Sequence, residues 1–186
     1  MAAGKTFAGR KFQGRVWTFG DDINTDLVIP NFAVLLPLEE QLEHCFSANR
    51  PGWVDEVQRG DVLVVGRNFG VGSARNIGAV FEALGVAGVV AESFNGLGLR
   101  NCINAGLPSL PCPGVTQLFT EGDVAEVDWT TGDVRNTTTG ATGQGAPIPP
   151  QLQDIIRGGG VEGVLRSEGY LADPGEVPVP VRPRSN

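Results

Sequence analysis

One short glycine-rich turn carries the residue types that are best suited to chemistry. Residues 70–75 read GVGSAR, so two glycines precede the hydroxyl of Ser73 and the guanidinium of Arg75. Glycine lets the backbone turn sharply and lets a ligand approach it closely. A serine, an arginine and free backbone amides together can bind a carboxylate that has a hydroxyl beside it.

Two interpretations of this turn stay open on the residues alone. Ser73 stands where a helix is predicted to begin, and serine is a favoured helix cap. Arg75 favours a binding site, because a helix N-terminus is already positive and an arginine there is mildly unfavourable unless an anion is bound. A phosphate-binding loop of the GxxxxGK type is the weakest interpretation, because its lysine is missing.

A second polar cluster, DDINTD at residues 21–26, precedes the apolar segment LVIP. Its three carboxylates and its asparagine are typical of a solvated turn in which side chains bond to the backbone. The cluster does not match an EF-hand calcium loop, because the glycine and the glutamate of that loop are absent.

A parallel strand–helix–strand unit must position the turn. An apolar strand over 61–65 leads into it, a helix with one apolar face follows over 73–84, and an apolar strand spans 86–91. Alternating residues at 123–129 and 133–138, joined by a TTGD turn, predict a β-hairpin. The other predicted elements are a strand at 10–19, an extended segment at 26–30, helices at 38–46, 99–105, 150–157 and 161–166, and a glycine- and threonine-rich loop at 139–145. The fold class is therefore α/β, with one domain over 1–172 and a disordered proline-rich tail over 173–186.

Charge and cysteine usage narrow the classes of function. The net charge of −7 argues against a nucleic-acid partner, which needs a basic surface. Cys45, Cys102 and Cys112 lack CxxC spacing, which favours buried free thiols over a disulfide framework or an iron–sulfur site made by this chain. His44 is typical of a helix end rather than of a metal ligand, so no metal site is predicted. No apolar run approaches the ~18 residues that span a bilayer, and no secretory signal is recognisable, so we expect a cytoplasmic protein without a membrane partner.

Several segments, taken in order, resemble one family. INTDLVIP resembles the NTDxIIP segment of isopropylmalate dehydratase small subunits, and GRNFGVGSARNIGAVFEALGVAGVVAESF resembles their GxNFGCGSSREH segment and the strand that follows it. RNCINAGLPSL, the hairpin GDVAEVDWTTGDVRNTTTG and the C-terminal PIPPQLQDIIRGGGVEGVL fit the same family. The match covers roughly residues 10 to 170. The chain thus resembles the swivelling β/β/α domain of the aconitase C-terminal type, with a parallel βαβ unit and an additional β-hairpin.

The resemblance implies half of a hydro-lyase. An aconitase-like large subunit would hold a 4Fe-4S cluster, and this chain would bind no cofactor of its own. The aligned serine, Ser73, would remove a proton from a carbon of a small dicarboxylate substrate. Arg75 would bind a substrate carboxylate and support the serine alkoxide, and Asp26 would join the polar network. The substrate-binding residues expected from these motifs are Gly72, Ala74, Asn24, Thr25, Phe32 and Val34.

The sequence departs from the family pattern beside the arginine. Ala74 replaces a second serine, and Asn76 and Ile77 replace a Glu-His pair. The loop after LVIP, NFAVLL at 31–36, has no arginine and is apolar, so it either forms a pocket for an alkyl group or packs in the core. The substrate is then 3-isopropylmalate, as in leucine biosynthesis, or a related alkylmalate. The alternatives are a catalytically degenerate swivel domain that regulates a partner and, ranked last, a stand-alone phosphate-binding domain.

Overall fold

Strand β1 (Lys11–Phe19) organises the fold because it takes part in two kinds of strand pairing. Its second half, from Val16 to Phe19, pairs in parallel with β2 (Val62–Val65). Its first half, from Lys11 to Arg15, pairs antiparallel with β5 (Val124–Asp128). The computed structural model describes residues 9–172, and their seven strands form one sheet in the order β4-β3-β2-β1-β5-β6-β7. One half of the sheet is therefore parallel and the other antiparallel.

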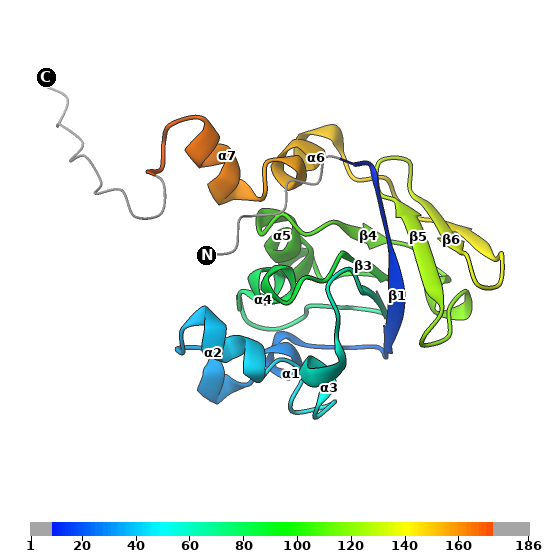
Figure 1. Ribbon diagram of the computed structural model, residues 1–186, viewed down its shortest axis with the longest axis horizontal. Coiled ribbons are helices and arrows are strands. Elements are labelled where there is room, and N and C mark those ends of the chain that lie inside the picture. Colours follow the sequence, from blue (N-terminus) through cyan, green and yellow to red (C-terminus); the bar gives the residue numbers. More distant parts are fainter. Residues whose placement is uncertain (1–8, 173–186) are drawn as a thin grey trace, which may run out of the picture.

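The remaining elements follow the chain order that Figure 1 shows. The other strands are β3 (Gly88–Ala91), β4 (Ser109–Pro111), β6 (Asp133–Asn136) and β7 (Thr142–Gln144). The α-helices are α1 (Thr25–Val28), α2 (Leu38–Glu43), α3 (Trp53–Glu56), α4 (Ile77–Leu84), α5 (Gly96–Asn104), α6 (Pro150–Arg157) and α7 (Val161–Ser167). Single 3-10 turns lie at Asn31–Ala33 and Val115–Gln117.

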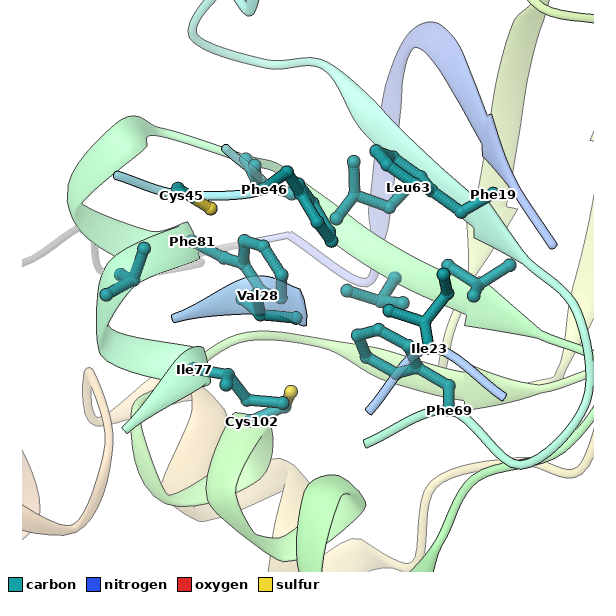
Figure 2. Packing of buried hydrophobic residues seen from close by; sticks show 14 of the residues in the cluster. Phe19, Ile23, Val28, Cys45, Phe46, Leu63, Phe69, Ile77, Phe81 and Cys102 are labelled. Atoms are coloured by element: carbon teal, nitrogen blue, oxygen red, sulfur yellow. The ribbon is translucent and has the colours of Figure 1, made fainter. Parts of the chain in front are cut away.

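The parallel strands are buried on both faces. They form a middle layer between the helices on one face and the antiparallel part of the same sheet on the other. Leu63 and Val65 of β2 point into a cluster shared with helices α4 and α5, part of which Figure 2 shows. Val62 and Val64 point into a second cluster shared with the antiparallel strands. Figure 1 shows the corresponding arrangement, with α2, α4 and α5 on one side of the parallel strands and β5 and β6 on the other. Burial on both faces explains the continuous apolar runs, because neither face of these strands meets water.

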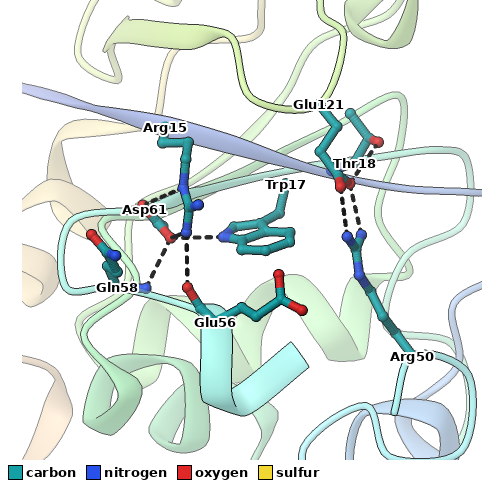
Figure 3. Close-up of polar contacts among 8 residues, drawn as sticks. All are labelled: Arg15, Trp17, Thr18, Arg50, Glu56, Gln58, Asp61 and Glu121. Carbon is teal, nitrogen blue, oxygen red and sulfur yellow. Dashed lines mark hydrogen bonds and ion pairs between the residues drawn. The ribbon is translucent and has the colours of Figure 1, made fainter. Parts of the chain in front are cut away.

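Charged side chains tie the residues that precede β2 and β5 to strand β1 (Figure 3). The buried carboxylate of Asp61 accepts hydrogen bonds from Arg15 Nη2 at 2.8 Å and from Trp17 Nε1 at 2.7 Å. Arg50 donates to both carboxylate oxygens of Glu121, at 2.7 and 2.6 Å. The guanidinium carbons of Arg15 and Arg50 each lie 4.5 Å from the centre of the Trp17 ring. Asp61 therefore satisfies the Trp17 N–H, which would otherwise be buried without a partner.

Most predicted elements are confirmed, and their boundaries shift by a few residues. The strand–helix–strand unit is β2-α4-β3, and β2 and β3 are parallel as predicted. The predicted hairpin is β5-β6, with Asp128 opposite Asp133 across the turn. The proline-rich tail over 173–186 lies outside the described residues. The division into one domain over 1–172 and a tail stays a prediction.

Three local predictions are wrong. Residues 26–30 are not extended throughout, because Asn24 caps the first turn of α1 by accepting the Leu27 N–H at 2.8 Å. The predicted helix over 73–84 begins only at Ile77, so Ser73 is not its cap. The predicted loop over 139–145 contains the short edge strand β7, which pairs with β6. Two further short elements, α3 and β4, carry no pattern strong enough to predict them.

Candidate active site

The two polar motifs lie side by side at the carboxyl ends of β1 and β2. Beyond β1, residues 20–25 run along residues 66–71 beyond β2. The Gly70 N–H donates to the Ile23 carbonyl at 2.9 Å, and the Thr25 N–H donates to the Val71 carbonyl at 2.9 Å. A parallel bridge joins Asn24 to Val71. The strands thus bring DDINTD and GVGSAR together, although long stretches of chain separate them.

An ion pair fixes the start of this double segment. The Arg67 side chain donates to Asp21 Oδ2 from Nε and Nη2, at 3.1 and 3.0 Å, and its backbone N–H donates to Asp21 Oδ1 at 2.7 Å. These hydrogen bonds hold the pKa of the Asp21 carboxyl below its usual value. The pair lines an open cavity of about 750 Å³ whose lining does not include Ser73, Arg75 or Asp26. The ion pair between Arg67 and Asp21 therefore holds residues 20–25 against residues 66–71.

The turn from Gly72 to Ala74 is exposed and keeps its hydrogen-bonding groups free. Within residues 9–172, the Ser73 hydroxyl makes no hydrogen bond, and the backbone N–H groups of Gly72, Ser73 and Ala74 have no acceptor. The carbonyl of Ser73 accepts the Arg75 N–H at 2.8 Å, which tightens the backbone after the turn. The turn therefore carries one hydroxyl and three adjacent N–H groups without partners among residues 9–172, a combination that can receive an anion.

Close backbone contacts set where this turn stands. A methyl group on Gly70 would lie 2.7 Å from the Cα of Gly98 in α5, and Gly70 has φ +76°. A methyl group on Gly72 would lie 2.9 Å from Thr25 Oγ1. Thr25 is buried, and its hydroxyl has no hydrogen-bond partner among the described residues. The backbone leading to Ser73 is thus held between α5 and the segment that contains Thr25.

Arg75 points back toward the segment that follows α1 rather than out to solvent. Its side chain is only 7% exposed. The Nη1 atom donates to the Ile29 carbonyl, Nη2 donates to Asn31 Oδ1 at 3.2 Å, and Nη2 forms an ion pair with Asp26 Oδ1 at 2.8 Å. The Asp26 side chain is 56% exposed. Arg75 therefore connects the serine turn to three neighbouring groups of residues 26–31.

These contacts limit what Arg75 can still bind. A guanidinium has five N–H donors, and each of the two edges that can grip a carboxylate with two parallel bonds uses a hydrogen of Nη2. The Nη2 atom donates to Asn31 Oδ1, and it also lies 2.8 Å from Asp26 Oδ1 in the ion pair. A two-pronged grip on a bound carboxylate would therefore displace Asn31 or bring the bound carboxylate against that of Asp26. In the present arrangement, Nε and one hydrogen of Nη1 remain available.

Of the other predicted site residues, some have a structural role and others have side chains exposed to solvent. Asn24 caps α1, and Ala74 is exposed next to Ser73. Phe32 is 66% exposed, whereas Val34 is half-buried against the apolar cluster that β2 shares with helices α4 and α5. Phe32 is thus free to line a pocket for an alkyl group, whereas Val34 packs against the core.

The departures from the family pattern have a partial structural account. Ile77, at the position of the family histidine, is fully buried in the core where α4 begins. Asn76 precedes it and is exposed, with no side-chain bond to the helix end. The site residue that the sequence interpretation missed is Asn31, and its only signal was an isolated polar side chain at the start of an apolar loop.

Other reactive groups lie away from this site. Cys45, Cys102 and Cys112 are free and buried, and burial raises the pKa of Cys112 to about 11. His44 ends α2, as predicted, and its ring packs edge-on against Phe32 with the ring centres 4.9 Å apart. Across residues 9–172, no three His, Cys, Asp or Glu side chains gather closely enough to hold a metal ion. None of the helices in this range is long and apolar enough to cross a membrane.

Comparisons with known proteins agree with this fold and this arrangement of motifs. The family described as the aconitase C-terminal domain matches residues 41–113. The 3-isopropylmalate dehydratase small subunit 1 of Methanopyrus kandleri is 40% identical over 162 residues, which cover 86% of this chain and 95% of that protein. The isopropylmalate/citramalate isomerase small subunit of Methanocaldococcus jannaschii is 35% identical and covers 84% of this chain and 94% of its own length.

A solved structure extends the agreement to three dimensions. The crystal structure of 3-isopropylmalate dehydratase from Methanocaldococcus jannaschii matches with a TM-score of 0.79 at 28% identity, over 86% of this chain and 95% of that one. The resemblance seen in the sequence motifs is therefore confirmed. This chain belongs to the family of 3-isopropylmalate dehydratase small subunits and has the fold of the aconitase C-terminal domain.

Proposed function

We propose that the chain is the small subunit of a hydro-lyase that dehydrates and rehydrates a 2-hydroxy dicarboxylic acid, 3-isopropylmalate or a related alkylmalate. The names of its relatives, which include a 3-isopropylmalate dehydratase and an isopropylmalate/citramalate isomerase, support this activity and a place in leucine biosynthesis. The partner is an aconitase-like large subunit that holds a 4Fe-4S cluster. Three free thiols support a reducing, cytoplasmic setting.

The observation that carries the proposal is the state of Ser73. Its hydroxyl is exposed, bonds to nothing among residues 9–172 and stands beside three unpaired N–H groups. A serine that only capped a helix would be bonded to that helix, and this one is not. The turn that carries Ser73 is held in place by backbone contacts, and Ser73 is exposed to solvent. Such a hydroxyl is suited to reach a substrate held by another subunit.

In this proposal Ser73 is the base. Dehydration removes a proton from one carbon of the substrate and a hydroxyl from the neighbouring carbon, so that a carbon–carbon double bond forms and water leaves. Ser73, as the alkoxide, would take the carbon-bound proton and become a neutral hydroxyl. The departing hydroxyl would take a proton from solvent or from the large subunit to leave as water, and loss of the Ser73 proton to solvent would restore the alkoxide. The N–H groups of Gly72, Ser73 and Ala74, which have no acceptor among residues 9–172, would stabilise negative charge that develops beside this turn.

Asp26 and Arg75 complete the polar network of the site. Their ion pair holds residues 26–31 against the serine turn, and the remaining Arg75 donors would contact one oxygen of a substrate carboxylate. The cluster in the large subunit would act as a Lewis acid on the departing hydroxyl. Phe32 and Val34 would lie beside the alkyl group of the substrate, while Asn24 and Thr25 would support the turn.

The proposal is tested by producing the chain together with the large subunit encoded beside it. The wild-type complex should dehydrate 3-isopropylmalate or citramalate, as measured by the ultraviolet absorbance of the unsaturated diacid. Ser73→Ala should lower kcat by about 10²- to 10⁴-fold, the range for losing a positioned base, while the complex still assembles in size-exclusion chromatography. Ser167→Ala, which removes an exposed hydroxyl that donates to the Val164 carbonyl on α7, is the control and should keep normal turnover.

Two results would contradict the proposal. Unchanged turnover in Ser73→Ala would exclude the base role. An assembled wild-type complex whose cluster is intact but which turns over neither substrate would instead indicate the degenerate, binding-only domain.

A further inference from the structure

We infer that Asn31 is a substrate-contacting residue whose side-chain N–H group donates to a carboxylate oxygen of the substrate diacid. The inference rests on the function proposed above and adds a specific donor to the site. Asn31 begins the 3-10 turn that follows Pro30, and its side chain is exposed.

Arg75 dictates which way the Asn31 amide faces. A carboxamide has an acceptor oxygen on one side and two N–H donors on the other, and a guanidinium offers donors only. The Oδ1 atom must therefore face Arg75 Nη2, which lies 3.2 Å away. The Nδ2 atom is left as the outer half of the amide, and it has no acceptor within the part of the chain that the structure describes.

The orientation matters because Asn31 and the Asp26 carboxylate both lie against Arg75 Nη2 and hinder a two-bond grip on a substrate carboxylate. Its Nη2 atom donates to Asn31 Oδ1 and lies 2.8 Å from the Asp26 carboxylate, so a substrate carboxylate held across Nη2 would displace Asn31 or lie against Asp26. A contact through one substrate oxygen avoids both. The second oxygen of a bound carboxylate needs another donor, and the Asn31 Nδ2 group is carried by the side chain that Arg75 itself holds. Asp26 already balances the charge of Arg75, so recognition at this position depends on directed N–H groups rather than on net positive charge.

Two substitutions separate the roles that Asn31 could have. Asn31→Asp has the same shape and keeps an acceptor for Arg75, but it loses the donor. Asn31→Ala loses both. Asn104→Asp, an exposed asparagine on α5 whose side chain makes no hydrogen bond among residues 9–172, is the control for the added negative charge. Each variant is produced with the large subunit, and KM and kcat are measured with 3-isopropylmalate and with citramalate.

We expect both Asn31 variants to raise KM by about tenfold or more, as the loss of one charge-assisted hydrogen bond predicts, with kcat changed much less. The thermal midpoint of the small subunit should stay near the wild-type value, and Asn104→Asp should keep the wild-type KM. A higher KM in Asn31→Ala alone would overturn the inference, because Asn31 would then only position Arg75. A higher KM in Asn31→Asp alone would overturn it as well, because the effect would be charge repulsion.

The substrate contact and the proposed function would be rejected by different results. An active wild-type complex whose KM is insensitive to both Asn31 substitutions rejects the substrate contact and leaves the proposed function standing. A wild-type complex that turns over neither diacid rejects the proposed function and the substrate contact together.

Discussion

Replacing Gly70 by alanine tests whether the backbone contact with α5 sets the position of the serine turn. The new methyl group would meet two obstacles. Gly70 has φ +76°, a conformation that costs an L-residue roughly 1–2 kcal/mol. The methyl carbon would also lie 2.7 Å from the Cα of Gly98, and a backbone atom of a packed helix cannot rotate away.

The expected magnitude follows from separating strain and clash. Gly52→Ala meets the same strain at φ +84°, with no heavy atom within 4 Å of the added carbon. Its cost is the conformational penalty less the roughly 0.4–1 kcal/mol by which alanine restricts the unfolded chain, or about 1 kcal/mol. Gly70→Ala should cost an additional 1–3 kcal/mol or so for overpacking. Its free energy of unfolding should therefore fall by about 2–4 kcal/mol.

A third variant isolates the clash. Gly98 lies in α5, does not have a positive φ, and faces the Gly70 backbone, so Gly98→Ala adds the steric contact without the strain. Urea unfolding followed by circular dichroism gives the free energies of all three variants, and turnover with the large subunit reports the position of Ser73. We expect Gly70→Ala and Gly98→Ala to lower kcat and Gly52→Ala to leave it unchanged. The reasoning is refuted if Gly70→Ala is no less stable than Gly52→Ala and is as active as wild type.

Three further predictions concern charge and selectivity. Arg75→Lys should raise KM by about tenfold or more, because one ammonium group cannot keep the contact with Asp26 and the neighbouring acceptors that the planar guanidinium holds; an unchanged KM would contradict this. The Arg50 hydrogen bonds hold the pKa of Glu121 at about 2, so Glu121→Gln should cost up to about 1 kcal/mol of stability near neutral pH, since the pair is partly exposed to solvent. That difference should vanish as the pH falls from 4.5 to 2 in acid unfolding curves, because a lowered carboxyl pKa stabilises the fold only above this window; a constant difference would argue against the ion pair. Phe32→Ser should lower the ratio of kcat/KM for 3-isopropylmalate over citramalate by about tenfold, and an unchanged ratio would place Phe32 outside the alkyl pocket.

Local pattern predicts the elements whose burial is uniform. The runs at 62–65 and 88–91 are apolar on both faces and are bounded by turns, so they are recognisable as parallel strands without tertiary information. The errors arise where two local signals compete. At 26–30 the β-branched residues and the proline favour extended backbone, yet the cap from Asn24 and the contacts of the following residues produce a helical turn. The edge strand β7 is too short and too polar to stand out from a loop.

The individual residues of the candidate site are predictable from the sequence, but the contacts between them are not. Ser73, Arg75 and Asp26 are recognisable from their motifs, and the ion pair of Arg75 with Asp26 agrees with a shared polar network. The position of α4 is not predictable, because serine in a glycine-rich turn is equally suited to capping and to exposure. The contact of Arg75 with Asn31 joins residues that are far apart in the chain, and no periodicity or spacing signals it.

The dual pairing of β1 also bears on how the chain acquires its shape. β1 lies near the start of the sequence, but Val16 finds its neighbour at Val62 and Arg15 finds its neighbour at Val124. Contacts this distant require large loops to close first, and such topologies fold slowly. During synthesis, the apolar side chains of β1 stay exposed until the residues that form β2 and β5 have emerged from the ribosome. Chaperone dependence and the yield of refolding from urea should therefore respond most strongly to substitutions that alter β1.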